Sequence, residues 1–160
     1  MSVLDKKISY FKNTRDTEVA GEVTIREILL KFEGNGNLEK RVTELRNDPS
    51  KSKAIKQSLP TFAMHGLFSY NRKKSNFIEA SGLIILDIDD VDVDIIQTTK
   101  LDIMEGSDHI AAVMTSPSGE GIKILYYVQP ELINAESYRQ IGKQIVEQFS
   151  SYGSVDYLSV

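Results

Sequence analysis

The pattern of apolar and polar positions is clearest in the second half of the chain. An almost continuous apolar run, Gly82 to Ile88, is typical of a strand buried on both faces. Helical spacing then alternates with further short apolar runs, bounded by Gly106, Gly121 and Gly153. The predicted elements are a strand at 82–88, a weak helix at 93–105, strands at 109–115 and 122–128, a helix from Asn134 to about Gly153, and a strand at 155–158.

Both predicted helices carry apolar residues. In the first, weaker helix these are Ile95, Ile96, Leu101 and Met104. The second is amphipathic, with Tyr138, Ile141, Ile145 and Phe149 on one face and Asn134 as the N-terminal cap.

In the first half of the chain, the patterns that predict helices and strands extend over fewer residues. Thr24 and Glu27 form a capping-box pattern, which predicts a helix that ends at Gly34. The other predicted elements are a strand at 8–11, a helix around 38–47, a helix at 50–59, one strand at 62–70 and an exposed basic turn at 71–76.

The order strand-helix-strand-strand-helix-strand in the second half predicts an α+β fold of the ferredoxin-like or RRM-like type, βαββαβ. In that arrangement the first strand lies between the third and the fourth and runs antiparallel to both. We therefore expect an RRM-like unit at 81–160, preceded by an N-terminal α/β module at 1–80, the two together forming one compact domain.

Composition favours a water-soluble protein. Hydrophobic residues make up 41% and charged residues 26% of the 160-residue chain, which has no cysteine. No apolar run approaches the roughly 20 residues that span a bilayer, and the N-terminus is not a signal peptide. We expect no membrane partner and a cytoplasmic location.

Charge is unevenly distributed. Nine Lys or Arg and two acidic residues lie between Lys40 and Lys74, which gives this region a net charge of +7. Since the whole chain has a net charge of −4, the remaining residues carry −11. This distribution indicates either a nucleic-acid-binding surface or an ordinary solvated helix face. The candidate nucleic-acid-binding residues are Lys51, Lys53, Lys56, Arg72, Lys73 and Lys74.

The candidate chemistry lies at the end of the apolar strand. Asp87 and Asp89 are two residues apart, so both side chains point to the same side of the strand. Placing two carboxylates side by side is costly without a compensating cation. The predicted strand order brings Asp156, Lys123 and Gly121 to the same corner, so we expect Asp87, Asp89 and Asp156 to bind Mg²⁺ or Mn²⁺, as two ions.

The turn 116–121 lies beside this corner. Its hydroxyls and glycine N–H groups are suited to holding a triphosphate, with Lys123 as a point charge. The expected nucleotide-binding residues are Ser116, Ser118, Gly119, Gly121 and Lys123. His65 is expected to be packed, His109 to be at the surface, and Asp90 to be solvated or an additional ligand.

These motifs resemble the VirE N-terminal domain family of bacterial mobile elements, which is related to archaeo-eukaryotic primases (primase-polymerases). The resemblance extends over nearly the whole chain. The matching residues are Ile8 to Phe11, Leu45, Arg46, Lys56, Leu59, Pro60, Gly66, Phe68, Ser81, Gly82, Leu86 to Asp89, Ser116 to Gly119, Gly121, Lys123 and Asp156.

The resemblance implies that Asp87 and Asp89 are the first primase motif and that Asp156 is the third. The second motif of the superfamily usually contains a histidine, whereas this chain has Ser116, Ser118 and Lys123 in that region. The implied activity is two-metal nucleotidyl transfer during replication of a mobile element. The implied partners are nucleotide triphosphates, a single-stranded template and a helicase-like domain or protein. Family members usually continue with an arginine and another strand, so we expect this chain to be C-terminally truncated.

Two other functions compete with a primase-polymerase. One is a non-catalytic module that binds single-stranded nucleic acid or a nucleotide. The other is a metal-dependent nuclease or nucleotidyl cyclase on the same scaffold.

Overall fold

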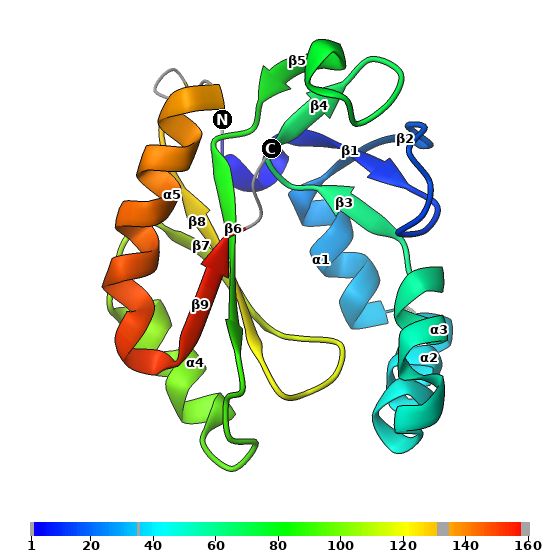
Figure 1. The fold of residues 1–160 in the computed structure, drawn as a ribbon, viewed down its shortest axis with the longest axis vertical. Helices are drawn as coiled ribbons and strands as arrows, with labels where there is room; N and C mark the ends of the chain where they lie inside the picture. Colours follow the sequence, from blue (N-terminus) through cyan, green and yellow to red (C-terminus); the bar gives the residue numbers. More distant parts are fainter. Residues whose placement is uncertain (1, 35, 131–134, 158–160) are drawn as a thin grey trace. The chain divides into compact units, whose positions relative to one another are not determined.

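The computed structural model describes residues 2–34, 36–130 and 135–157, and it divides the chain into two units, Met1–Ser81 and Gly82–Val160 (Figure 1). Both units combine helices with antiparallel strands, so the α+β class is confirmed. Each unit is described below by itself.

The first unit contains two small sheets. β1 (Lys7–Phe11), β2 (Gly21–Thr24) and β3 (Thr61–Ala63) form one in the order β2-β1-β3, and β4 (Gly66–Phe68) pairs with β5 (Phe77–Ala80) in the other. Ile8 and Phe11 of the central strand are fully buried. The Ser9 hydroxyl accepts a hydrogen bond of 2.9 Å from the N–H of Phe68, so β1 also contacts β4.

The helices of this unit are α1 (Ile25–Gly34), α2 (Gly36–Asn47) and α3 (Ser52–Ser58). The predicted capping box is confirmed: Glu27 accepts from the N–H of Thr24 at 2.7 Å, and Thr24 Oγ1 accepts from the N–H of Glu27 at 3.2 Å. Because both terminal N–H groups have partners, α1 can begin directly at the end of β2.

The prediction of a single strand at 62–70 is wrong. The structure has β3 and β4 there, with a turn at Met64 and His65 between them. The turn allows β4, which begins at Gly66, to pair antiparallel with β5. The two backbones approach so closely that a Cβ on Gly66 would lie 2.1 Å from the carbonyl oxygen of Glu79. β2 and β5 were not predicted, since each is four residues long and contains a glutamate among its apolar residues.

The second unit is built on one four-stranded antiparallel sheet. Its strands are β6 (Leu83–Asp89), β7 (Ile110–Thr115), β8 (Ile122–Tyr127) and β9 (Ser154–Tyr157). Their order is β7-β8-β6-β9. The first strand of the unit therefore lies between its third and fourth and is antiparallel to both, as the ferredoxin-like arrangement predicts.

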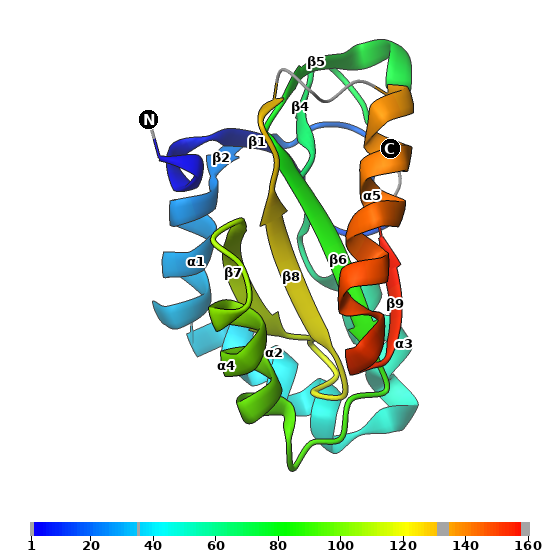
Figure 2. The same cartoon turned by 90° about the vertical axis from the view of Figure 1, so that its left-hand side faces the viewer.

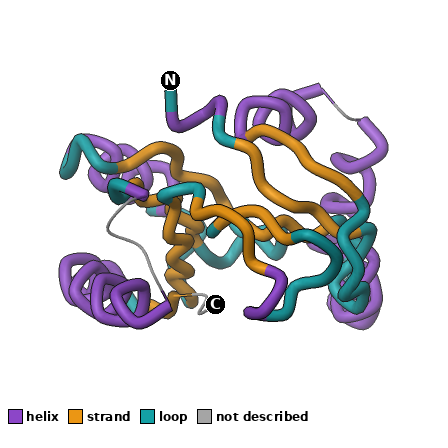
Figure 3. Tube along the Cα trace, turned by 90° about the horizontal axis from the view of Figure 1, so that it is seen from above, coloured by secondary structure: helices purple, strands orange, loops and turns teal. Residues whose placement is uncertain are grey.

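Two helices cover one face of this sheet, α4 (Ile96–Glu105) and α5 (Ala135–Phe149) (Figure 2). Seen from above, both lie on the same side of the strands (Figure 3). Ile84, Leu86 and Ile88 of β6 point toward them and pack with Tyr138 and Ile145 of α5. The predicted apolar face of α5 is confirmed.

Only some of the apolar residues of α4 are buried. Ile95, Leu101 and Met104 are exposed, whereas Ile96 and Ile103 enter the core. Ile96 and Ile103 are seven residues apart, two helical turns, so they share a face. α4 begins at Ile96, three residues later than the predicted start at 93.

The remaining short elements are single 3-10 turns at Val3–Asp5, Pro49–Lys51, Lys74–Asn76 and Ser150–Tyr152. Two predictions, the cap at Asn134 and the end of the last strand at Leu158, lie outside the described residues. No helix within the described ranges is long and apolar enough to cross a membrane.

Gly82, where the second unit begins, is a position that only glycine fits. Its φ is +84°, and a Cβ there would lie 2.5 Å from the carbonyl oxygen of Val128. We expect Gly82→Ala to lower the free energy of unfolding by about 1–3 kcal/mol. Gly36→Ala is the matched control, because a Cβ there meets nothing within 4 Å and should be neutral or stabilising by up to about 1 kcal/mol. Urea unfolding measures both, and equal losses would contradict this account.

Candidate functional site

The two aspartates at the end of β6 lie on the face of the sheet opposite α4 and α5. Strand alternation causes this, because Leu86 and Ile88 point into the helix-covered core and Asp87 and Asp89 point the other way. Asp87 is half-buried and Asp89 is exposed. The pair therefore differs in environment, and only Asp87 carries an appreciable cost of desolvation.

Strand pairing places two charged residues beside Asp87. Lys123 of β8 is its register partner on one side and Asp156 of β9 on the other. Directly paired residues on antiparallel strands share a face, with Cβ atoms about 4.5–5.5 Å apart. The predicted convergence of Asp87, Lys123 and Asp156 is thus present in the backbone register.

Lys123 forms an ion pair with Asp87, its ammonium group contacting both carboxylate oxygens. The side chains are 27% and 23% exposed, respectively. A pair this shielded from water is stronger than a surface pair, because solvent screens it less. The charge of Asp87 is therefore already compensated by a cation of the chain itself.

The turn after β7 uses most of its polar groups internally. Ser116 is buried and its hydroxyl is 3.1 Å from that of Ser118. The N–H of Ser116 donates to Gly121 at 2.7 Å, and that of Gly119 donates to Ser116 at 2.9 Å. These bonds make a tight loop, with Gly119 at φ +87°, rather than an open ring of free donors.

Gly121 joins this turn to the acidic corner. A Cβ on Gly121 would lie 2.7 Å from the carbonyl oxygen of Ile88 and 3.6 Å from Oδ1 of Asp89. The close approach requires glycine and brings the end of the turn beside the Asp89 carboxylate. The structure thus places Asp89 next to the turn and Asp87 next to Lys123 and Asp156.

The acidic corner is not a ready three-carboxylate centre. Within residues 2–34, 36–130 and 135–157, no three acidic or histidine side chains are grouped closely enough to hold a metal ion. Asp156 is exposed. Asp90 is also exposed, at φ +59°, and Asp92 accepts a hydrogen bond of 3.0 Å from the N–H of Asp94.

Mg²⁺ needs only one or two protein carboxylates when phosphate oxygens and water complete its shell. The cross-strand neighbours Asp87 and Asp156 fit that donor set, with Asp89 two residues along the same strand. The corner therefore fits one ion that arrives with a phosphate better than two resident ions.

The six basic residues selected from the sequence separate into two groups. Lys51 is ion-paired with Glu44 at 3.4 Å and with Asp48 at 3.3 Å, and these carboxylates raise its pKa. Arg72 donates to the carbonyl oxygen of Thr14 at 2.7 Å and stacks over the ring of Phe11 at 5.3 Å. All six side chains are exposed, and the remaining four have no ion-pair partner among the described residues: Lys53, Lys56, Lys73 and Lys74.

Neither histidine lies in the acidic corner. His65 packs between Phe68, with ring centroids 5.3 Å apart, and Phe77, at 6.1 Å. Burial lowers its pKa to about 4. His109 is exposed, as expected, and its ring stacks on Tyr126 at 5.5 Å.

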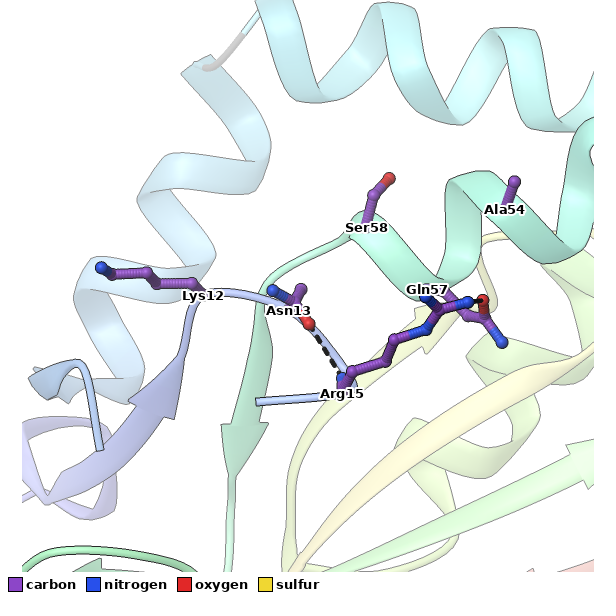
Figure 4. Close-up of a pocket in the computed structure, with 6 residues that line it drawn as sticks. All are labelled: Lys12, Asn13, Arg15, Ala54, Gln57 and Ser58. Atoms are coloured by element: carbon purple, nitrogen blue, oxygen red, sulfur yellow. Dashed lines mark hydrogen bonds between the residues drawn. The ribbon is translucent and has the colours of Figure 1, made fainter. Parts of the chain in front are cut away.

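Sequence reasoning missed a pocket in the first unit. It lies between the loop after β1 and helix α3, and is lined by Lys12, Asn13, Arg15, Ala54, Gln57 and Ser58 (Figure 4). Its residues come from two segments about 40 positions apart, with no motif that joins them.

Comparison with known families identifies the chain. Residues 54–151, more than half of its length, match the BT4734-like N-terminal domain. The chain belongs to this family. The matched region contains Asp87, Asp89 and the turn through Lys123, and it ends before Asp156. No curated protein and no solved structure gives a significant match.

Removing the cation of the central ion pair should destabilise the fold. We expect Lys123→Met to lower the free energy of unfolding by about 1–3 kcal/mol, less than the loss for a fully buried pair, because Asp87 keeps its charge without a partner. The double variant Lys123→Met/Asp87→Asn should recover most of this loss. Lys7→Met, at the exposed Lys7–Glu22 pair, is the control and should cost under about 1 kcal/mol. A double variant no more stable than Lys123→Met would contradict the assignment.

The buried His65 should make stability depend on pH. Its folded pKa of about 4 is below the ordinary 6.5, so the unfolded chain binds the proton first as the pH falls. The contribution of neutral His65 to the free energy of unfolding is therefore fully present above pH 6.5, and this free energy should decrease by about 1–3 kcal/mol toward pH 4. Urea unfolding between pH 7 and 4 should show a weaker decrease in His65→Gln. His109→Gln, at an exposed position, should retain the wild-type decrease; identical slopes in all three proteins would refute this.

Proposed function

We propose that the second unit binds a nucleoside triphosphate with Mg²⁺ or Mn²⁺ and transfers a nucleotide to a nucleic-acid strand, as a primase-polymerase does. The observation that carries the proposal is the register of the sheet, which sets Asp87 between Lys123 and Asp156. Asp89 lies beside Gly121 at the end of the serine-glycine turn. Carboxylates, a cation and a serine-glycine turn at one sheet corner are groups that phosphoryl chemistry uses.

Asp87 and Asp156 would hold the divalent ion, with Asp89 available as a further oxygen ligand. When bound, the ion neutralises phosphate charge and polarises the reacting phosphorus centre. The contribution of the protein is mainly to position the nucleotide and stabilise its charge.

Lys123 would have two successive partners. Without a nucleotide its ammonium group neutralises Asp87. Asp87 would hold a divalent ion through the same carboxylate oxygens, and the ammonium group of Lys123 could then donate to a phosphate oxygen.

The exposed lysines of the first unit would bind the template. Lys53 and Lys56 of α3 and the adjacent pair Lys73 and Lys74 are exposed. Such contacts recognise phosphates rather than bases, so affinity should fall with salt without strong sequence preference. Lys51 and Arg72, which are also exposed, would have to exchange their partners within the chain to join them.

In this proposal the chain is related to the VirE N-terminal domain and to primases. It would act in replication of a mobile element, beside a helicase-like domain or protein. The match to the BT4734-like family supports a common domain type. The DxD pair and the turn through Lys123 lie inside the matched region, as a shared site requires.

A second function, nucleic-acid or nucleotide binding without chemistry, is favoured by one observation. Lys123 already compensates Asp87, and within the described residues no three carboxylates are grouped as a metal centre. A sheet with this corner can bind an anionic strand through Lys123 without any metal ion. The two functions differ in whether binding depends on divalent ions.

Nucleotide incorporation tests the proposal. With Mn²⁺, labelled nucleotides and a single-stranded template, primed or bare, the wild type should form product. Asp87→Ala and Asp89→Ala should each reduce the rate by about 100-fold or more, because the ion supplies several kcal/mol. Asp94→Ala, a nearby exposed acid outside the corner, is the matched control and should retain activity.

Thermal unfolding separates the two functions. A ligand specific for the native state stabilises it by about 2.7 kcal/mol at 100 times its Kd. Mn²⁺ with a nucleoside triphosphate should raise the midpoint of the wild type and not of Asp87→Ala. A midpoint unmoved by metal and nucleotide, with strand binding intact in EDTA, would replace the proposal by the binding module.

A further inference from the structure

The pocket of the first unit has the chemistry of an anion site. Its volume is about 400 Å³, within the usual range for small-molecule sites. Two of its six lining residues are cationic, Lys12 and Arg15, and none is acidic. A third cation, Arg41, donates to the hydroxyl of Ser58 on the pocket wall.

The loop that carries both cations is held in place by Asn13. Its side-chain oxygen accepts from the N–H of Arg15 at 2.9 Å and of Asp16 at 3.2 Å. Its amide group donates to the carboxylate of Asp16 at 2.9 Å. The nearest acid of the loop is therefore occupied by Asn13, and neither Lys12 nor Arg15 has a salt-bridge partner among the described residues.

The same loop is tied to α3 and to the basic turn. Thr14 donates through its N–H and its hydroxyl to the carbonyl oxygen of Gln57, both at 3.3 Å, and Arg15 reaches the Gln57 side chain (Figure 4). From the other direction, Arg72 donates to the carbonyl oxygen of Thr14 at 2.7 Å. The pocket is thus built before any ligand arrives, which lowers the entropic cost of binding.

Lys12 and Arg15 extend from the loop in opposite directions in Figure 4, on the two sides of Asn13. Arg15 extends toward Gln57 of α3, whereas Lys12 extends away from α3 (Figure 4). The guanidinium group of Arg15 and the hydroxyl and amide groups of Ser58 and Gln57 are donors suited to an oxyanion, and Lys12 adds positive charge at the other side of the loop.

We propose that this pocket is a phosphate-binding site, through which the first unit holds a phosphate group of a nucleotide or of a nucleic-acid strand. The site is distinct from the acidic corner of the second unit and requires no metal ion. It also gives Arg72 a positioning role, since its bond to Thr14 supports the loop rather than contacting the ligand.

A pair of variants at Ala54 tests the site without removing any bond of the loop. Ala54 lines the pocket from the exposed side of α3. Ala54→Glu adds a negative charge, whereas Ala54→Gln adds the same volume without charge. Binding of a fluorescent thymidine oligonucleotide is measured with the full chain in EDTA, so that the result is independent of the divalent-ion site.

We expect Ala54→Glu to weaken binding by about fivefold or more relative to Ala54→Gln, through repulsion at short range. Lys12→Ala should lessen the slope of log affinity against log salt by about 0.7, the value for one contact to a single strand. Lys31→Ala, an exposed lysine of α1 outside the pocket, should leave the slope unchanged.

Two competitors identify the source of the phosphate. If ATP displaces the oligonucleotide and its own binding weakens in Ala54→Glu, the site takes free nucleotides. If ATP does not compete, the site takes phosphodiesters of a strand. Equal affinities of Ala54→Glu and Ala54→Gln for both probes, or no binding of either probe by the wild type, would overturn the proposal. Matching urea midpoints of the two variants establish that folding is not the cause.

Discussion

The position of β6 at the centre of its sheet is the constraint on which the second unit depends. Leu83 to Leu86 and Ile88 are all buried, so this strand needs a neighbour on each edge and cover for its side chains. β8 and β9 supply the edges, and α4 and α5 cover one face. Once those pairings form, Asp87 has Lys123 on one side and Asp156 on the other, because the strand register fixes which residues are directly paired.

Charge balance at this corner follows from the same register. A half-buried carboxylate needs a cation, and the ammonium group of Lys123 provides one. The pair is expected to stabilise the fold, and under the proposed function the same carboxylate would also bind a divalent ion.

The cations of the first unit differ in whether they have partners within the chain. Some cations have structural partners, such as Lys51 with Asp48 and Arg72 with Thr14. Others, such as Lys12 and Arg15, are held at the rim of a preformed pocket. Net basic charge by itself thus says little about binding, because hydrogen bonding decides which cations remain available for a phosphate.

Local patterns in the sequence determined the long elements. The capping box of α1, the apolar stripe of α5 and the buried run of β6 could be identified because each depends on near neighbours along the chain. From these and the βαββαβ order, the strand neighbours of Asp87 also followed. The break between β3 and β4, the four-residue strands β2 and β5 and the buried face of α4 escaped prediction, since partners distant in sequence define them.

Tertiary structure alone decided which polar groups are already in use. No local rule indicates that Arg72 donates to the carbonyl oxygen of Thr14, that Arg15 reaches the side chain of Gln57, or that residues 12–15 meet α3 in a pocket. Hydrogen bonds and ion pairs act over a few ångströms in space, whereas sequence patterns report only separation along the chain. The residues of the acidic corner could therefore be identified in the sequence, whereas the pocket of the first unit was defined only by folding.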